Sequence, residues 1–449
     1  MARVPTVSEG EWVILDVNGG ERASFVRAFP TENALIHKKR HALLGPIVGA
    51  PYGSCWALST SNTLEPTDAP CPYAEALSVE DAKAATEEGK SNCAIVDDGR
   101  SQKLTGDDVS QMQEDGLTAE QIVERLASNS ASFANKTTFS QEKWKRKKLN
   151  KHAVVVTVLR PTAQRICEAY FAKMPKRIDH MRFDTLSIML AAANVHAFSS
   201  PLVIENCSGL LVGAVAERMN GYGRVCAGQL SDSTVVQRDI LNFFNFDARV
   251  RTSIVSAPVE ALVKAAAVET TASTSPSAAA AAEASTAMEC ENEPPAAAAA
   301  ALGAEGEAEA AAAPKKSDHV LRRLDDAEIA ACARSGFSSL ILAAPQLEPI
   351  AALKSILPLL APSSPFVVYC KWLPPLAEAA HALVRGHPIK ALNIELHESW
   401  MREHQVLPSR THPMMRMSGT GGYLLTGVTF ADTAAPAASA GAGKKRARE

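Results

Sequence analysis

The sequence lacks the cysteine and histidine spacings that hold a structural metal or a disulfide framework. Its nine cysteines are scattered over 449 residues, no two of them form a CxxC pair, and no Cys/His cluster has zinc-ligand spacing. Dense disulfides stabilise small secreted domains. The irregular cysteines therefore exclude that class, predict no metal site and favour a reduced compartment, the cytosol or the nucleus.

Long hydrophobic runs and a strong charge of one sign are also missing. No run of about 18 apolar residues occurs outside the alanine tracts, so we expect no membrane contact. The first residues, MARVPTVSEGEW, have no apolar core of a signal peptide, so we expect none. The net charge of −3 excludes a uniformly basic protein, but such an average can hide local clusters. The length predicts two to three domains.

Composition divides the chain into five parts. Residues 1–92 predict a β-rich N-terminal domain, residues 93–152 a helical basic connector, residues 153–263 and 318–432 an α/β domain, residues 264–317 a disordered alanine-rich insertion and residues 433–449 a basic tail. Short apolar runs with Asn-Gly and Gly/Pro turns make the first part typical of a small barrel or sandwich. Alternating strands and helices predict a parallel sheet with crossover helices in the α/β domain.

One turn of the α/β domain stands where a cofactor loop belongs. Residues 203–214 (VIENCSGLLVGA) follow a predicted strand and open a helix, as does the acid-x-Gly-x-Gly-x-Gly turn that binds S-adenosylmethionine in Rossmann-type methyltransferases. Glycines there let the backbone approach the ligand. The sequence keeps its acid and two glycines but has larger side chains at the first and third glycine positions. These residues are Glu205, Gly209 and Gly213, and Cys207 and Leu211, respectively.

Other cofactor and catalytic groups are absent from their expected positions. The next strand, residues 224–230, ends without the carboxylate that would hold the ribose hydroxyls, and residues 342–345 (LAAP) offer no acid to accept a proton from a base. The motif alone leaves two interpretations open, a turn whose small residues serve packing and a degenerate relic of a cofactor loop. Both predict that this chain has no catalytic residue and binds no cofactor.

The connector ends in the densest cluster of positive charge in the chain. Seven basic residues between Lys136 and Lys151 face a single acid, Glu142. Such a cluster neutralises RNA phosphates, and an aromatic residue within it can stack on a base; a solvated, lysine-rich linker is the alternative. The candidate RNA contacts are Lys143, Trp144, Lys145, Arg146, Lys147, Lys148 and Lys151, with Arg100, Lys103, Arg182, Arg410 and His412 as secondary candidates.

Several ordered segments resemble one known family. They are residues 98–105 (DGRSQKLT), 129–143, 177–186 (RIDHMRFDTL), 205–213 (ENCSGLLVG), 365–370 (PFVVYC), 400–413 and 417–425. Together they are similar to the non-catalytic subunit of the eukaryotic tRNA (adenine-58-N1)-methyltransferase, over most of residues 9–430 apart from the alanine-rich insertion. The family's own turn also departs from the intact glycine pattern.

The resemblance implies a Rossmann-like methyltransferase fold with a degenerate cofactor site, preceded by a small β-barrel-like N-terminal domain. It implies that S-adenosylmethionine is held by a catalytic partner, in a heterotetramer of two plus two subunits that grip tRNA together. It also implies a nuclear protein, which agrees with the basic tail. A stand-alone RNA-binding or translation factor, and an active methyltransferase with an unusual cofactor loop, remain the alternatives.

Overall fold

The computed structural model of the chain describes most of the predicted folded parts. The described residues are 4–37, 40–59, 61–68, 102–115, 117, 119–136, 138–230, 238–273, 321–386, 391–406, 411–415, 417 and 419–430. The predicted basic tail and most of the predicted alanine-rich insertion lie outside them. No helix among these residues is long and apolar enough to cross a membrane.

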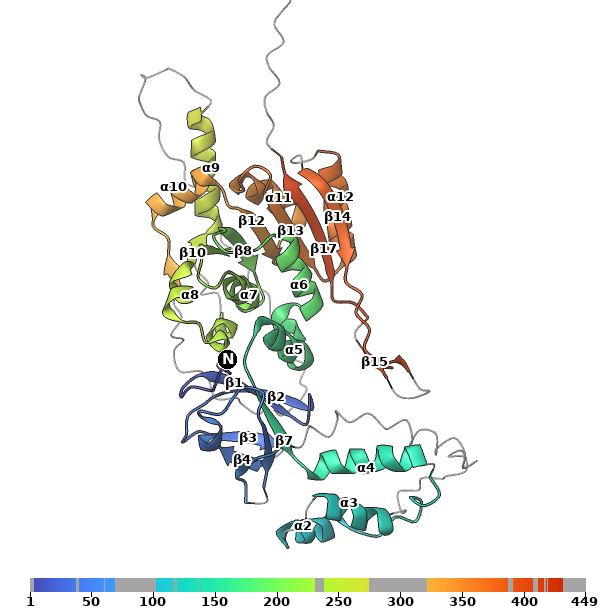
Figure 1. Cartoon of the computed structure of the whole chain (residues 1–449). Coiled ribbons are helices and arrows are strands. Elements are labelled where there is room, and N and C mark those ends of the chain that lie inside the picture. Colours follow the sequence, from blue (N-terminus) through green and yellow to red (C-terminus); the bar gives the residue numbers. More distant parts are fainter. Residues whose placement is uncertain are drawn as a thin grey trace, which may run out of the picture.

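The N-terminal domain is built on a five-stranded antiparallel sheet of order β2-β1-β7-β5-β6 beside a separate β3-β4 hairpin (Figure 1). Its strands are β1 (Trp12–Val17), β2 (Arg22–Arg27), β3 (Asn33–His37), β4 (Arg40–Leu43), β5 (Cys55–Leu58), β6 (Leu64–Pro66) and β7 (Val155–Leu159), with the 3-10 helix η1 (Gly45–Ile47). Alternate residues of β1 and β7 form its core, among them Val13, Leu15 and Val156. The predicted β-rich domain is present.

Strand β7 corrects the predicted domain boundary. Residues 154–158 were expected to begin the α/β domain, whereas β7 lies between β1 and β5 and pairs antiparallel with both. Its apolar run suits any fully buried strand, so the local pattern does not identify the sheet to which it belongs. The connector is therefore an insertion within the N-terminal domain.

The inserted connector is helical, as predicted. It contains α2 (Gly106–Glu114), α3 (Ala119–Ser128) and α4 (Thr138–His152). Met112, Ile122 and Leu126 form its small core. The basic run forms a 15-residue helix, α4, so a linker without regular structure is excluded for this segment, while a solvated helical connector stays the alternative to an RNA contact.

The α/β domain has an eight-stranded sheet of order β11-β10-β9-β8-β12-β13-β17-β14. The strands are β8 (Pro201–Glu205), β9 (Val225–Gln229), β10 (Ile254–Pro258), β11 (Arg322–Arg323), β12 (Ser339–Ala343), β13 (Pro365–Cys370), β14 (Ala391–Glu398) and β17 (Tyr423–Thr429). The six strands β11, β10, β9, β8, β12 and β13 are parallel to one another. Strand β17 runs antiparallel to both of its neighbours, β13 and β14. The winding reverses between β8 and β12, the switch point at which such sheets bind ligands. This arrangement confirms the predicted Rossmann-like methyltransferase fold.

Helices cover both faces of this sheet. One layer holds α5 (Ala163–Lys173), η3 (Pro175–Ile178), α6 (Phe183–Ala192), α7 (Leu210–Met219), η4 (Asp239–Phe244) and α8 (Ala248–Ser253); the other holds α9 (Val259–Ser273), α10 (Asp326–Ser335), α11 (Pro349–Ile356), η5 (Leu357–Leu359) and α12 (Leu373–Val384). Successive residues of β8 alternate between the two cores, with Val203 in one and Ile204 in the other. Helix α9 continues past the predicted boundary at residue 263, in agreement with the high helix propensity of alanine.

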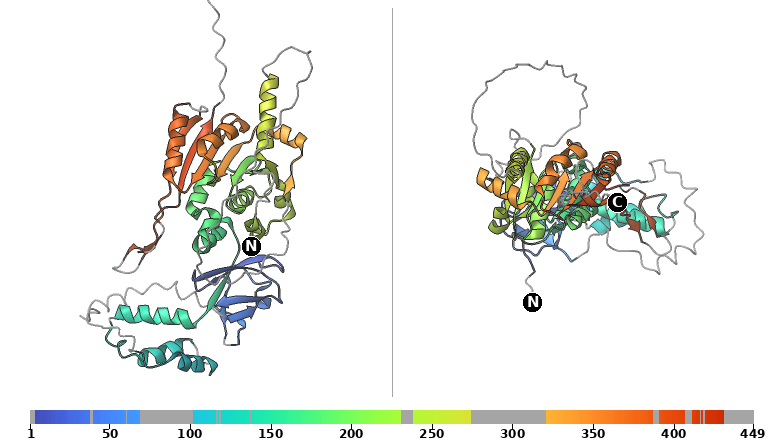
Figure 2. Two further views of the ribbon diagram at one scale, coloured as in Figure 1. Left: turned by 180° about the vertical axis from the view of Figure 1, so that it is seen from behind. Right: turned by 90° about the horizontal axis from the view of Figure 1, so that it is seen from above.

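A projecting arm, residues 399–421, joins β14 to β17 and contains the small hairpin β15 (His404–Gln405) and β16 (His412–Pro413). The views in Figures 1 and 2 agree that this arm and α4 lie on the same flank of the molecule.

Candidate functional site

The acid of the predicted cofactor turn acts as an internal helix cap. Glu205 ends β8 and is buried; its Oε2 accepts a hydrogen bond from the Leu211 N–H (3.0 Å) and its Oε1 accepts one from Val212 (2.9 Å). Burial raises the pKa of the Glu205 carboxyl, whereas the two N–H groups oppose that shift. Both carboxylate oxygens are thus committed to the first turn of α7, where a negative charge is stabilising.

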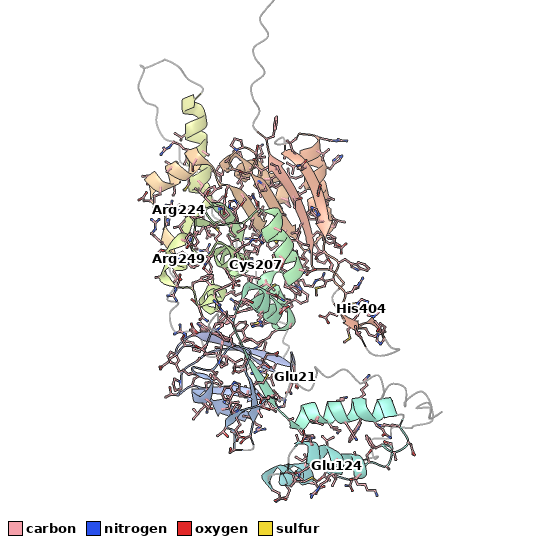
Figure 3. All side chains as sticks on the ribbon, viewed as in Figure 1. Glu21, Glu124, Cys207, Arg224, Arg249 and His404 are labelled. Atoms are coloured by element: carbon pink, nitrogen blue, oxygen red, sulfur yellow. The ribbon has the colours of Figure 1, made fainter. Side chains whose placement is uncertain are left out.

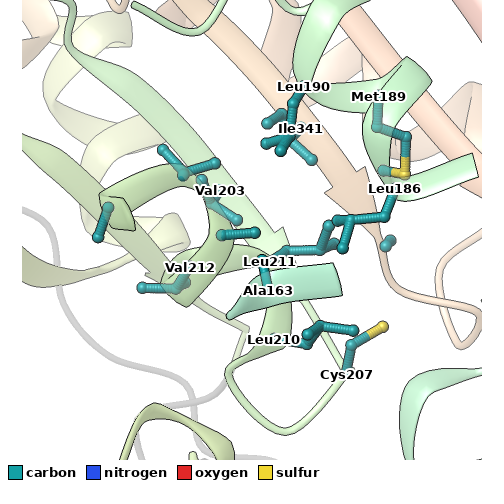
Figure 4. Packing of buried hydrophobic residues seen from close by; sticks show 14 of the residues in the cluster. Ala163, Leu186, Met189, Leu190, Val203, Cys207, Leu210, Leu211, Val212 and Ile341 are labelled. Atoms are coloured by element: carbon teal, nitrogen blue, oxygen red, sulfur yellow. The ribbon is translucent and has the colours of Figure 1, made fainter. Parts of the chain in front are cut away.

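The two residues that replace glycine in this turn belong to the hydrophobic core. Cys207 and Leu211 are fully buried, and Figure 4 shows Leu211 beside Leu186 of α6 and Cys207 next to Leu210. Neither side chain is directed into open space. Core packing therefore accounts for both side chains, and this holds for a packing turn as well as for a degenerate cofactor loop.

The remaining glycines make room for another part of the chain. Gly209 has a φ of +94°, and a Cβ atom there would lie 3.0 Å from side-chain atoms of Arg238 and Leu241. A Cβ on Gly213 would enter the ring of Phe244. Close approach to residues 238–244 thus explains both glycines without a ligand.

We call residues 238–245 the latch segment, because they join the cofactor turn to the N-terminal domain. On the turn side, the Ile240 N–H donates to the Ser208 carbonyl (3.1 Å) and Asp239 pairs with Arg177 (2.9 Å), while Leu241 and Phe244 are buried. These contacts hold the segment firmly against the turn.

On the other side, the latch segment contacts β1 and β2. The Phe243 ring stacks on Phe25, with centroids 4.4 Å apart, and meets Trp12 edge-on at 4.8 Å. The side-chain amide of Asn245 donates to the backbone carbonyl of Trp12 and accepts from the backbone N–H of Trp12, both at 2.8 Å. Residues that face the turn therefore also dock the two domains together.

These residues do not fit S-adenosylmethionine. Arg238 and Leu241 pack against the glycine that the cofactor would approach, and β9 ends at Gln229 without an acid for the ribose. At the end of β12, the Ala343 carbonyl accepts a hydrogen bond from the Asn206 N–H (2.9 Å), and residues 344–347 contain no acid. Over the part of the chain that the structure describes, no group of three His, Cys, Asp or Glu side chains could hold a metal ion.

The basic helix α4 presents lysines to solvent. Lys143, Lys145 and Lys147 are exposed, and we call them the α4 surface; Lys148 is half-buried over the Trp144 ring (5.4 Å). The side chains of Arg146 and Lys151 lie outside the described residues. Of the candidates on α4 whose side chains the structure describes, these three lysines are therefore the exposed ones.

Trp144 packs within the connector. Its ring lies on Phe133, with centroids 5.0 Å apart, and on the small core of the connector. It anchors α4 to α3 and is only partly buried, so its contact with an RNA base stays a prediction. Helical spacing places it on the inner side, which the charge pattern alone did not reveal.

The secondary candidates fall into three groups. Arg100 and Arg410 lie outside the described residues, whereas Lys103 and His412 are exposed. Arg182 is only 5% exposed; its guanidinium holds both oxygens of Asp184 (2.6 and 2.8 Å) and donates to the Ser399 carbonyl (3.2 Å). The prediction that Arg182 contacts RNA is wrong, because its hydrogen-bonding groups are used inside the protein.

The neighbourhood of Arg182 anchors the arm. The Thr185 hydroxyl donates to the Gly421 carbonyl (3.0 Å) and lies 2.8 Å from the Ser399 hydroxyl, so α6 holds both ends of the arm. The sequence motif at 177–186 thus serves the arm as well as the core.

The arm itself exposes large apolar side chains. Trp400 is 77% and Met415 91% exposed, and Leu396 on the neighbouring strand β14 is also exposed. Exposed apolar clusters on a monomer mark interaction surfaces, and an edge strand offers free backbone groups for pairing. The sequence analysis did not identify this surface, because its residues are dispersed over residues 391–415.

A groove of about 740 Å³ lies between the arm, α5 and the β1-β2 hairpin. Its charged lining includes Arg165 and Lys173 as well as Asp16, Glu168 and Glu403. With both signs present, the groove is not a dedicated phosphate site.

The chain is similar in sequence to one family of known proteins. The model of the Gcd10p family matches residues 6–293. The chain is 32% identical to the tRNA (adenine(58)-N(1))-methyltransferase non-catalytic subunit TRM6 of Mus musculus, covering 94% of this chain and 88% of that protein, and 31% identical to trm6 of Dictyostelium discoideum, covering 94% and 79%. A solved tRNA (m1A58) methyltransferase, TrmI of Aquifex aeolicus, is 12% identical with a TM-score of 0.43, covering 95% of this chain and 100% of that one. The chain therefore belongs to the Gcd10p family.

Proposed function

We propose that this chain is the non-catalytic, tRNA-binding subunit of the complex that methylates N1 of adenine 58 in tRNA. The observation that carries the proposal is the latch segment packed against the degenerate cofactor turn, which leaves the fold intact without a fit for S-adenosylmethionine. The relatives' name, non-catalytic subunit, supports the same conclusion. A catalytic partner would then hold the cofactor and supply the chemistry.

We further propose how the chain meets its partners. The α4 surface binds tRNA phosphates, since clustered lysines release counterions from RNA. The arm and β14 bind the catalytic subunit, because Trp400, Met415 and Leu396 expose large apolar side chains there. A heterotetramer of two plus two subunits and a nuclear location complete the proposal, supported by the family resemblance and, for the nucleus, by the basic tail.

The isolated chain should not bind S-adenosylmethionine. Calorimetric titration of the purified full chain is expected to show no heat of binding, because Leu241 and Arg238 pack on Gly209. A micromolar dissociation constant would instead support the alternative of an active methyltransferase with an unusual loop.

Charge on the arm should separate the chain from its partner. Replacing Trp400 and Met415 by aspartate should abolish co-purification of the catalytic subunit, because desolvating two carboxylates in an apolar interface is costly. Both side chains are solvent-exposed, so the fold should be unchanged. Val268→Asp, at another exposed apolar site on α9, is the control. Normal co-purification of the double variant would contradict the assignment of the arm. If the unaltered chain itself never co-purified with a methyltransferase, a stand-alone RNA-binding or translation factor would be favoured.

A further inference from the structure

Two loops at the amino ends of β8 and β9 expose a pair of aromatic rings. Phe198 precedes β8 and is 80% exposed; Tyr222 precedes β9 and is 42% exposed. Their ring centroids lie 5.4 Å apart at an interplanar angle of 50°. The Phe198 N–H donates to the Tyr222 carbonyl (3.0 Å), so the backbone fixes the two loops to each other.

The backbone of Phe198 is strained. Its φ is +68°, a conformation that bulky residues rarely adopt and that glycine or asparagine adopts at little cost. Because the ring is largely exposed, burial does not compensate for that strain. Strained residues of this kind cluster at binding sites.

The surroundings of the two rings are basic. The Arg249 guanidinium lies 4.5 Å above the Tyr222 ring, and Arg224 is exposed two residues after that tyrosine. The nearby acids are already engaged: Asp247 caps α8 by accepting from the Val250 N–H (2.8 Å), and Glu328 is paired with Arg322 (2.7 Å). The charge around the rings therefore favours an anionic ligand.

We propose that Phe198, Tyr222, Arg224 and Arg249 form an aromatic platform that stacks unpaired RNA bases while its arginines contact phosphates. Aromatic faces accept any base, and arginine adds cation–π and phosphate contacts. Two exposed rings are too little apolar area for a protein interface of ordinary size. The inference rests on the proposed RNA-binding function and adds a second contact region, on the flank away from α4, where Figure 3 labels Arg224 and Arg249.

Single-stranded RNA provides the test. In the full chain, Phe198→Gly and, separately, Arg249→Gln should each weaken binding of a single-stranded oligoribonucleotide about tenfold, and binding of a fully paired RNA of the same length by less than twofold. Glycine tolerates the positive φ, so the thermal stability of Phe198→Gly should not fall. Val384→Ala and Arg385→Gln remove an exposed apolar group and an exposed charge on or next to α12 and should leave both affinities unchanged.

The outcomes separate this inference from the proposed function. If the platform variants keep full single-stranded affinity while loss of the α4 lysines weakens tRNA binding, the platform is wrong and the proposed function stands. If neither set of variants affects RNA binding, both are wrong. If Phe198→Gly releases the catalytic subunit but not RNA, the surface is a protein contact and the platform is again overturned.

Discussion

Gly213→Ala is expected to destabilise the protein, although alanine is the better helix former. The new methyl group would enter the Phe244 ring, and overpacking of this kind costs about 1–3 kcal/mol, more than the roughly 1 kcal/mol that alanine gains over glycine in a helix. Phe244→Ala alone should cost about 3–5 kcal/mol, because this ring of the latch segment is buried against α7 at Gly213. Denaturant unfolding measures both.

The double variant makes this expectation specific. Once Phe244 is alanine, the space beside residue 213 is open, and Gly213→Ala should become neutral or stabilising by about 1 kcal/mol. That reversal of sign would show that the glycine is retained for Phe244. An equal loss of stability in both backgrounds would mean that the latch segment does not explain this glycine.

Removing the charge of the α4 surface should give the largest loss of RNA binding. Replacing Lys143, Lys145 and Lys147 by alanine is expected to weaken tRNA binding about 10- to 100-fold at low salt. Each phosphate contact contributes roughly one unit to the slope of log affinity against log salt, so the slope should become shallower by about 2 to 3. Fold stability should be unaffected, since all three side chains are exposed and the anchor Trp144 is untouched.

A charge-matched variant provides the control. Lys264, Lys354 and Arg385 are also exposed, and they lie on or next to helices of the α/β domain. Their joint replacement removes the same three charges and should leave affinity within about twofold. An unchanged salt slope in the α4 variant, or an equal change in the control, would show that non-local charge and not this helix attracts RNA.

Local sequence patterns predicted where helices and strands occur better than they predicted which strands pair with each other. The turn from Glu205 to Gly213, the helix carrying Leu186 and Met189, and the central strands all occur as expected. Strand β7 was assigned to the wrong domain, because an apolar run records burial but not the neighbouring strand. Pairing between distant segments decides that choice.

In the candidate site, too, the sequence predicted local features but not contacts between distant residues. The substitutions at Cys207 and Leu211 already indicated that the turn was not an ordinary cofactor loop. The latch segment was not foreseen, because Phe243 and Asn245 acquire their role only through contact with Trp12, more than 200 residues earlier. Arg182 was misassigned for the same reason: its charge is visible in the sequence, whereas its burial is not.

Counting cofactor sites in the assembled complex tests the central claim most directly. Calorimetric titration of S-adenosylmethionine into the purified complex should give one binding site for each pair made of this chain and one catalytic subunit. The catalytic subunit should contribute every site. A partner variant unable to bind the cofactor should then reduce the stoichiometry to zero. One site per chain, or binding that persists with that partner variant, would contradict the account, because this chain's own turn would then hold the cofactor.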